Sequence, residues 1–296
     1  MASHTRQVHA VLLFKQSMLY GFLSIWTFIM IAPFGWTVLT ALKTESQTRA
    51  FPPQWIPNPV IMSNFSTALS SANFGRYFVN SVIVTGATVI LCVFLSSLTG
   101  YALARLRFPG RQFFYFLMLG TLMVPGQVTM IPVYIIMKHI PLIGGNDILG
   151  QGGTGWLNTY PGLIIPGVAS AFGIFLMRQF MQSLPAELEE AARIDGCSEF
   201  GIFWRIILPQ CTPALIALGL FTFVASWNDF LWPLIVTNTD EMKTVQLGLG
   251  VFRGYFRIQW NLLMAAVVVI SLPPIIVFVI GQRHFVKGVS FSGLKG

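Results

Sequence analysis

The sequence is poor in charged residues, and this scarcity excludes a soluble globular protein. Asp, Glu, Lys and Arg make up 9% of its 296 residues and hydrophobic residues 54%, whereas a soluble domain carries roughly 25% charged residues. The formal net charge is +8, but the basic residues stand singly between apolar runs. This pattern is typical of Lys and Arg that flank membrane-spanning segments. We therefore expect the chain to contact a lipid bilayer and no nucleic acid.

Residue types that build metal sites and active sites are also scarce. The three cysteines, Cys92, Cys197 and Cys211, have neither metal-ligand nor redox spacing, so we expect them to be unpaired. His139 and His284 lie alone at the ends of apolar segments. No G-x-x-x-x-G-K-S/T motif occurs, so the chain cannot hold nucleotide phosphates in the usual way. The sequence thus predicts no metal site, no bound cofactor and no catalytic residue.

Six apolar segments are long enough to cross a membrane as helices. A helix needs roughly 20 apolar residues to span a hydrocarbon core of about 30 Å. The segments cover residues 17–42, 78–104, 112–137, 160–177, 212–236 and 262–281. Asp229, in the fifth segment, is the one charged residue that they contain. We predict an all-α integral membrane protein in which residues 1–296 form a single domain of six transmembrane helices.

The distribution of basic residues predicts the orientation of the chain. An even number of spans places both termini on one side of the membrane. More of the 18 Lys and Arg residues fall in the segments on that side than in the segments on the other. By the positive-inside bias, we expect both termini in the cytoplasm.

Residues 183–209 form a long hydrophilic stretch between two predicted spans on the cytoplasmic side. Pro185 suits a first helical turn, acidic residues follow it where the helix dipole favours negative charge, and Gly196 suits a left-handed cap. Ser198 can cap a second short helix that runs to about Ile207. We predict a helix–turn–helix that packs onto the bundle through an apolar stripe. The stripe comprises Phe200, Phe203, Trp204 and Ile207.

This segment has the properties of a docking surface for another protein. Small residues would let a partner approach the backbone closely, and charged residues would orient that partner. The residues of this docking surface are Glu190, Ala191, Ala192, Arg193, Asp195 and Gly196. From the pattern alone, an ordinary amphipathic hairpin at the membrane surface is an equal alternative.

The spacing within this segment resembles that of a known family. Glu190-Ala191-Ala192, Gly196 and the run Ile206-Ile207-Leu208-Pro209 are similar to the EAA loop of permeases in binding-protein-dependent ABC importers. Other stretches resemble the carbohydrate-uptake class of these permeases, to which the maltose permease belongs. These stretches are residues 101–110, 227–233 and 293–296.

The resemblance implies a type I ABC importer permease fold in a bacterial inner membrane, with residues 183–209 as a cytoplasmic coupling-helix loop. The docking surface would then bind a cytoplasmic ATPase subunit, with Glu190 facing basic residues of its cleft. The implied partners are two ATPase subunits that carry ATP and Mg²⁺, a second, unlike permease subunit, and a periplasmic or lipid-tethered solute-binding protein. Residues 290–296 would extend towards the ATPase interface. The chain itself would be a transport subunit and not an enzyme.

Polar and aromatic residues inside the predicted spans are candidates for a solute path. Asp229 is costly in a membrane, so it should face the bundle interior or lie near its rim. Trp227, Asn228 and Trp232 offer polar groups and flat aromatic faces that suit sugars. Gln127, in the third segment, is a weaker candidate. The alternative is a structural role, in which Asp229 holds a bend in its helix.

We expect the solute to be a sugar or oligosaccharide, with a polyol, a uronic-acid oligomer or a glycerol-phosphate compound as alternatives. The main alternative from another class of protein is an ion-coupled secondary transporter. Such proteins usually show internal repeats and paired intramembrane ionisable groups. Six spans with one acid offer little of either, and this alternative leaves the resemblance to the EAA loop unexplained.

Overall fold

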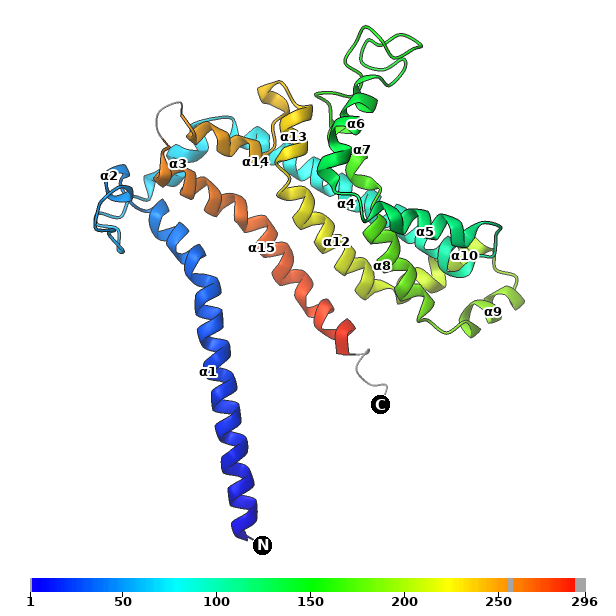
Figure 1. Cartoon of the computed structure of the whole chain (residues 1–296), viewed down its shortest axis with the longest axis horizontal. Coiled ribbons are helices and arrows are strands. Elements are labelled where there is room, and N and C mark those ends of the chain that lie inside the picture. The colour runs from blue at the N-terminus through cyan, green and yellow to red at the C-terminus, as the bar shows by residue number, and fades with distance from the viewer. Residues whose placement is uncertain (1, 255–257, 291–296) are drawn as a thin grey trace. The chain divides into compact units, whose positions relative to one another are not determined.

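Helices make up nearly all the regular structure of the chain (Figure 1). The computed structural model describes residues 2–254 and 258–290, and within these ranges it contains no β-strand. The all-α prediction is therefore confirmed. The chain divides into two compact units. Unit 1 is Met1–Ala72 with Val251–Ile270, and unit 2 is Asn73–Gly250 with Ser271–Gly296.

Three helices and three bent helix pairs within the described residues are long and apolar enough to cross a membrane. The single helices are Leu13–Ala41, Phe74–Arg105 and Trp260–Arg283. The pairs are α5 (Arg111–Thr121) with α6 (Gly126–Lys138), α7 (Tyr160–Val168) with α8 (Ala171–Gln182), and Glu199–Gln210 with α12 (Thr212–Trp227). Their bends are 105°, 43° and 79°. When each pair counts as one span, the total is six, the number that the sequence predicts. The third pair differs from the predicted fifth segment, because Glu199–Gln210 lies within residues 183–209, which the sequence predicts to be cytoplasmic.

Unit 1 is held together by a buried asparagine. Its helices are α1 (Ala2–Ala41), α2 (Glu45–Thr48), α3 (Ser63–Ser70) and the first part of α15 (Trp260–Ser290). The Nδ2 of Asn64 donates to the carbonyl oxygens of Ala41 and Lys43, each at 2.8 Å. Its Oδ1 accepts a hydrogen bond from Asn261 at 3.2 Å. Most apolar side chains of α1 beyond residue 12 are exposed, as expected of a helix that faces lipid.

Helix α4 (Phe74–Arg105) is the centre of unit 2 and packs against α7, α8 and α12 (Figure 1). Small residues bring α4 and α8 close together. A Cβ atom on Gly100 would lie 2.8 Å from the Cβ of Met177. One on Gly173 would lie 2.5 Å from the Oγ of Ser96. Because lipid tails are as apolar as the side chains, close packing of this kind drives the association of helices in membranes.

The fifth predicted segment is divided by a break. Helix α12 ends at Trp227, and after residues 228–230 the chain continues as α13 (Leu231–Val236). The Oδ1 of Asp229 accepts a hydrogen bond from the backbone N–H of Trp232 at 3.3 Å. A side-chain acceptor at this place satisfies an N–H group of the first turn, which stabilises the start of α13.

The remaining short elements of the described chain connect these helices. They are α9 (Glu187–Ile194), α10 (Glu199–Ile202), a π-helix (Phe203–Ile207), α11 (Leu208–Gln210), α14 (Val245–Gly248) and two 3₁₀ turns at Asp240–Met242 and Leu249–Phe252. Helices α9 to α11 form the hydrophilic segment that the sequence predicts as a helix–turn–helix.

Candidate functional site

Helix α9 ends in the cap that its sequence predicts. Gly196 has a φ of +80°, the left-handed conformation that glycine adopts without strain. Its N–H donates to the carbonyl of Arg193 at 3.1 Å. The N–H of Cys197 donates to the carbonyl of Ala192 at 3.0 Å. These two bonds form a Schellman motif, so the local sequence determines where α9 stops.

Ser198 caps the second helix, as predicted, but the apolar side chains that this helix buries differ in part from the predicted stripe. The Ser198 Oγ accepts a hydrogen bond from an N–H of the first turn at 3.2 Å. The chain then forms the π-helix Phe203–Ile207, whose wider turn rotates the following side chains relative to an α-helix. Phe200 and Trp204 are 60% and 51% exposed, and Ile202 is buried instead. The prediction that those two rings pack onto the bundle is therefore wrong.

The buried side of this segment packs against α4, α8 and α12. The residues of this core cluster are Tyr101, Met177, Met181, Ala192, Ile202, Phe203, Ile207, Cys211, Ala214 and Leu218. The segment is therefore an integral part of unit 2.

Glu189 fastens α9 to the end of α4. Its side chain is 4% exposed, and its Oε1 lies 3.1 Å from the Nε of Arg105, whose side chain is 12% exposed. The Nη2 of Arg105 also donates to the carbonyl of Leu184 at 2.6 Å and to that of Met181. Removing either partner of a buried pair leaves an uncompensated charge, which is strongly unfavourable. The pair therefore holds α9 against α4.

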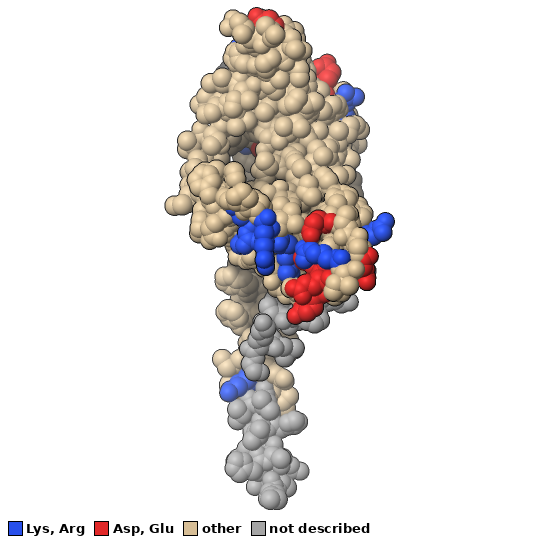
Figure 2. Space-filling view, turned by 90° about the vertical axis from the view of Figure 1, so that its right-hand side faces the viewer, with Lys and Arg blue, Asp and Glu red and all other residues tan. Residues whose placement is uncertain are grey.

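Arg193 joins α9 to α10. Its Nε lies 2.8 Å from the Oε1 of Glu199, and its Nη2 lies 3.4 Å from the Oε2 of Glu189. The hydroxyl of Tyr101 donates to the other oxygen of Glu199 at 3.0 Å. The hydrogen bond between Arg193 and Glu199 lowers the pKa of Glu199 and raises the pKa of Arg193. On the face drawn in Figure 2, basic and acidic side chains gather in one region, and most of the rest of this face is uncharged.

The six residues of the predicted docking surface do not share one face. Five are exposed, namely Glu190, Ala191, Arg193, Asp195 and Gly196. Ala192 is 5% exposed and belongs to the core cluster, and Arg193 bonds to α10. Leu188 and Ile194, which the sequence did not single out, are 40% and 86% exposed. The exposed side of α9 is thus a mixture of apolar and acidic side chains.

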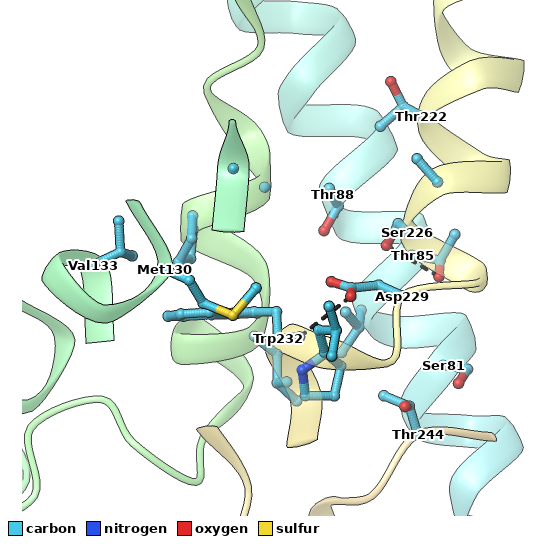
Figure 3. A pocket seen from close by; sticks show the side chains of 18 of the residues that line it. Ser81, Thr85, Thr88, Met130, Val133, Thr222, Ser226, Asp229, Trp232 and Thr244 are labelled. Carbon is cyan, nitrogen blue, oxygen red and sulfur yellow. Dashed lines mark hydrogen bonds between the residues drawn. The ribbon is translucent and has the colours of Figure 1, made fainter. Parts of the chain in front are cut away.

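Unit 2 also contains a cavity of about 430 Å³ between α4, α6, α7 and the break that separates α12 from α13 (Figure 3). Gln127, Asp229 and Trp232 of the predicted solute path line it. Trp227 is 2% exposed and packs among aromatic rings. Asn228 is exposed and donates to the backbone of α12. The structure thus brings three of the five predicted residues together and places the other two outside the lining.

Asp229 lies both at the start of α13 and at the wall of the cavity. Its carboxylate caps α13 through the N–H of Trp232 and also lines the cavity (Figure 3). The indole Nε1 of Trp232 donates to the carbonyl of Gly162 at 2.9 Å, which fixes the orientation of the ring. The described ranges contain no group of His, Cys, Asp or Glu side chains that could hold a metal ion.

Residues 93–291 match the profile of a family described as the binding-protein-dependent transport system inner membrane component. The match covers more than half of the chain and includes α9, the π-helix and the break after α12. The chain belongs to this family. The permease is accordingly a multi-pass inner-membrane transport subunit and not an enzyme.

Two curated relatives are similar to nearly the whole permease. It is 34% identical over 272 residues to the arabinooligosaccharides transport system permease protein AraQ of Halalkalibacterium halodurans, over 91% of this chain and 92% of the relative. It is 34% identical over 268 residues to the sn-glycerol-3-phosphate transport system permease protein UgpE of Yersinia pestis, over 88% of this chain and 90% of the relative. These relatives favour the ABC importer and not the ion-coupled secondary transporter.

A solved structure confirms the fold. The permease has a TM-score of 0.77 to a chain of a bacterial ABC transporter involved in the import of the acidic polysaccharide alginate. The likeness covers 90% of this chain and 95% of that chain, at 22% sequence identity. The type I importer permease fold that the sequence predicts is therefore the fold of this chain.

Proposed function

We propose that the permease is one of two unlike membrane subunits of an ATP-driven importer, and that it moves a sugar or oligosaccharide inward. The relative named for arabinooligosaccharides supports a carbohydrate solute. The relative named for sn-glycerol-3-phosphate keeps a glycerol-phosphate compound as an alternative, beside polyols and uronic-acid oligomers. A solute-binding protein, either periplasmic or lipid-tethered, delivers the solute to the permease.

The coupling to ATP takes place at α9 in this proposal. The observation that carries it is the contrast between the two sides of this helix. Glu190 and Ile194 are exposed on one side, while Glu189 on the other side is paired with Arg105 of α4. Each of two cytoplasmic ATPase subunits, which carry the ATP and Mg²⁺, binds one permease through such an exposed side. Ala191 and Gly196 allow the ATPase backbone to come close.

Two connections carry a displacement of α9 to the cavity. The first is the ion pair with Arg105, which lies at the end of α4, the helix that lines the cavity with Thr85 and Thr88. The second runs through the π-helix and α11 directly into α12, which lines the cavity with Ser226. Closure of the ATPase pair on ATP would therefore move α4 and α12 together and change the side to which the cavity opens.

The orientation follows from the same proposal. Residues 183–209 lie between the fourth and fifth spans, so they face the same side of the membrane as both termini. Because the ATPase is cytoplasmic, both termini are cytoplasmic as well. The expected contact of residues 290–296 with the ATPase falls almost wholly on residues 291–296, which lie outside the described residues.

A charge reversal tests the coupling role. Glu190→Lys should abolish ATP-driven uptake in the complete transporter, while the amount of permease in the membrane and its melting temperature stay unchanged, because Glu190 is exposed. Glu187→Lys is the matched control, since Glu187 is exposed in the same first turn but lies outside the docking surface. Wild-type uptake by the Glu190→Lys variant would contradict the coupling role.

The partners are tested by affinity purification in mild detergent followed by mass spectrometry. We expect an ATPase with a phosphate-binding G-x-x-x-x-G-K-S/T motif and a second multispan chain to co-purify. A permease that purified alone, and that transported solute when reconstituted alone, would contradict the importer and favour an ion-coupled secondary transporter.

A further inference from the structure

A groove of about 650 Å³ lies between α9 and the turn that joins α4 to α5. Its volume falls in the range of roughly 300–1,000 Å³ that small-ligand pockets occupy. The charged residues among its described lining are Arg105, Arg107, Arg111, Glu189, Glu190, Arg193 and Glu199. All of them belong to unit 2, and none lines the cavity of Figure 3. The groove is therefore a second, strongly charged concavity of this unit.

Two of the guanidinium groups in the groove are already neutralised. The Nε of Arg105 lies 3.1 Å from the Oε1 of Glu189. The Nε of Arg193 lies 2.8 Å from the Oε1 of Glu199. These four side chains balance one another in charge, so they leave the other arginines of the lining without a countercharge.

Arg107 and Arg111, on the turn between α4 and α5, have no carboxylate partner. Arg107 is exposed and makes neither a hydrogen bond nor an ion pair with the described residues. The Nη1 of Arg111 donates to the carbonyl of Leu106 at 3.0 Å, which holds this half-buried side chain at the groove. A guanidinium has five N–H donors, so most of those of Arg111 remain available. Two such groups in one groove suit a phosphate, whose oxygens match the planar fork of arginine.

The remaining carboxylate of the lining does not neutralise these two arginines. Glu190 is exposed on α9, across the groove from the turn, and forms no ion pair within the described chain. In the function proposed above, Glu190 faces basic residues of the ATPase. Its charge is then balanced by the partner, and the two cations of the turn stay available for another anion.

The apolar surface next to the two arginines indicates where this anion comes from. Helix α5 begins at Arg111 and is the first part of a bent pair that is apolar enough to cross a membrane. Phe113, Phe116 and Leu117 on this helix are 65%, 59% and 57% exposed, as expected of side chains that contact acyl chains. Arginine at the end of such a helix extends its charged head to the membrane surface. Arg107 and Arg111 therefore lie at the level of the lipid headgroups.

The charge of the membrane surface favours an anionic lipid at this place. In the proposed orientation the turn is cytoplasmic, and the cytoplasmic leaflet is the one that carries anionic lipids. Each arginine near such a surface gains about 1 kcal/mol, a change of roughly fivefold in the binding constant. A zwitterionic headgroup would instead bring its own ammonium group beside the two guanidinium groups, and like charges in contact are unfavourable.

We propose that this groove binds the phosphate of an anionic phospholipid of the cytoplasmic leaflet through Arg107 and Arg111. The bound headgroup would lie beside the ion pair between Arg105 and Glu189, which holds α9 to α4. The proposal goes beyond the importer function and applies to any transported solute. It rests on that function only for the leaflet from which the lipid comes.

Lipid binding is measured by native mass spectrometry of the complete transporter in detergent. The probes are phosphatidylglycerol and phosphatidylcholine with identical acyl chains, at matched concentrations. We expect the wild type to bind phosphatidylglycerol more tightly. Arg107→Gln and Arg111→Gln should each weaken this binding roughly fivefold, and the double variant about 25-fold, with the binding of phosphatidylcholine unchanged. No preference in the wild type, or an unchanged preference in the double variant, would overturn the site.

Arg205→Gln is the matched control for the loss of one positive charge. Arg205 is exposed in the π-helix, on the same side of the membrane, and lies outside the groove. Its replacement should leave the binding of phosphatidylglycerol unchanged. A loss as large as that in Arg107→Gln would show that the lipid responds to net charge alone, and would overturn the site. Arg107 is exposed, so its replacement should also leave the melting temperature unchanged.

A competition experiment distinguishes a lipid from a free anion. Inorganic phosphate should not displace phosphatidylglycerol at equal concentration, because it lacks the acyl chains that contact the apolar side of α5. Displacement by inorganic phosphate would assign the groove to a soluble anion and overturn the lipid site.

An acidic segment of the ATPase is the other occupant that the two arginines would suit. In that case Arg107→Gln would weaken the binding of the ATPase in detergent without phosphatidylglycerol, and this result would overturn the lipid site. The failure of the lipid site leaves the permease bound to its ATPase. The failure of the importer function abolishes that association, whereas the permease purified alone would still prefer phosphatidylglycerol.

Discussion

Arg105 and Glu189 form a buried ion pair that joins the end of α4 to the buried side of α9, with Nε and Oε1 3.1 Å apart. The pair lies between the proposed docking surface and a helix that lines the cavity. Arg105 also holds the carbonyl of Leu184, in the chain just before α9. One guanidinium thus fixes both the start and the buried side of the element on which an ATPase would act.

Loss of the buried carboxylate should destabilise the permease. Glu189→Gln leaves the guanidinium of Arg105 buried without a countercharge, and we expect the free energy of unfolding to fall by on the order of 3 kcal/mol. Glu187→Gln, at an exposed position of the same turn, should change it by less than about 0.5 kcal/mol. The measurement is denaturant unfolding of the purified permease, followed by tryptophan fluorescence. Equal unfolding midpoints for the two variants would contradict this reading of the pair.

The exposed isoleucine of α9 should contribute to binding of the ATPase. Ile194→Ser removes an apolar side chain that is 86% exposed, and we expect the affinity for the purified ATPase subunit to fall roughly tenfold, since burial of an isoleucine contributes about 1.5–3 kcal/mol. Ile148→Ser is the control, because Ile148 is 75% exposed in a loop of unit 2 outside the docking surface. Equal affinities of the two variants would exclude Ile194 from the interface.

Close packing between α4 and α8 should not tolerate an added methyl group. Gly173→Ala would place a Cβ atom 2.5 Å from the Oγ of Ser96, and overpacking of this kind costs about 1–3 kcal/mol. Gly86→Ala on α4 is the matched control, because its Cβ would meet no atom within 4 Å. A methyl group there should leave stability unchanged or raise it by up to about 1 kcal/mol, the difference in helix propensity. Thermal unfolding in detergent separates the two, and a Gly173→Ala variant as stable as the wild type would contradict the packing.

The contact between α9 and α10 should weaken only in acid. Because Arg193 lowers the pKa of Glu199 in the folded protein, the stability that this carboxylate contributes is present at and above the pKa of an unfolded glutamate, about 4.3. It is lost as the pH falls through the lower pKa of the folded state. The wild type should therefore exceed Glu199→Gln in melting temperature at pH 7 and lose this advantage below about pH 4.

Exposure to solvent limits the stability that the ion pair between Arg193 and Glu199 contributes. The side chains of Arg193 and Glu199 are 40% and 47% exposed, so the difference at pH 7 should be less than about 1 kcal/mol. Melting curves of both proteins between pH 7 and pH 3.5 supply the measurement. A difference that disappeared already at pH 6 would show that another group is responsible.

The sequence by itself determined the helical membrane class, the presence of several apolar segments long enough to span a membrane, and the caps of the docking segment. Six apolar segments of sufficient length must become helices in lipid, because only there are all backbone groups satisfied within the segment. The caps at Gly196 and Ser198 depend on residues within a single turn, so they too follow from local sequence. The spacing of Glu190, Ala191 and Gly196 was likewise sufficient to indicate the family.

Only the tertiary structure decided which neighbouring side chains face inward. Glu189 and Glu190 are adjacent and chemically identical, and the rotation of α9 against α4 buries the first and exposes the second. The π-helix, which begins after Phe200 and contains Trp204, has no counterpart in simple periodicity, and both of these rings are exposed. These outcomes depend on contacts between helices that are distant in the sequence.

The cavity was decided in the same way. Its lining combines Thr88 of α4, Asp229 of the break after α12 and Thr244 of a later loop. Asp229 stands out in the sequence as the one charged residue of the predicted spans, whereas Thr88 and Thr244 do not stand out in their own segments. Packing of several elements around one space brings these three residues together. Such convergence in three dimensions has no local signature in the chain.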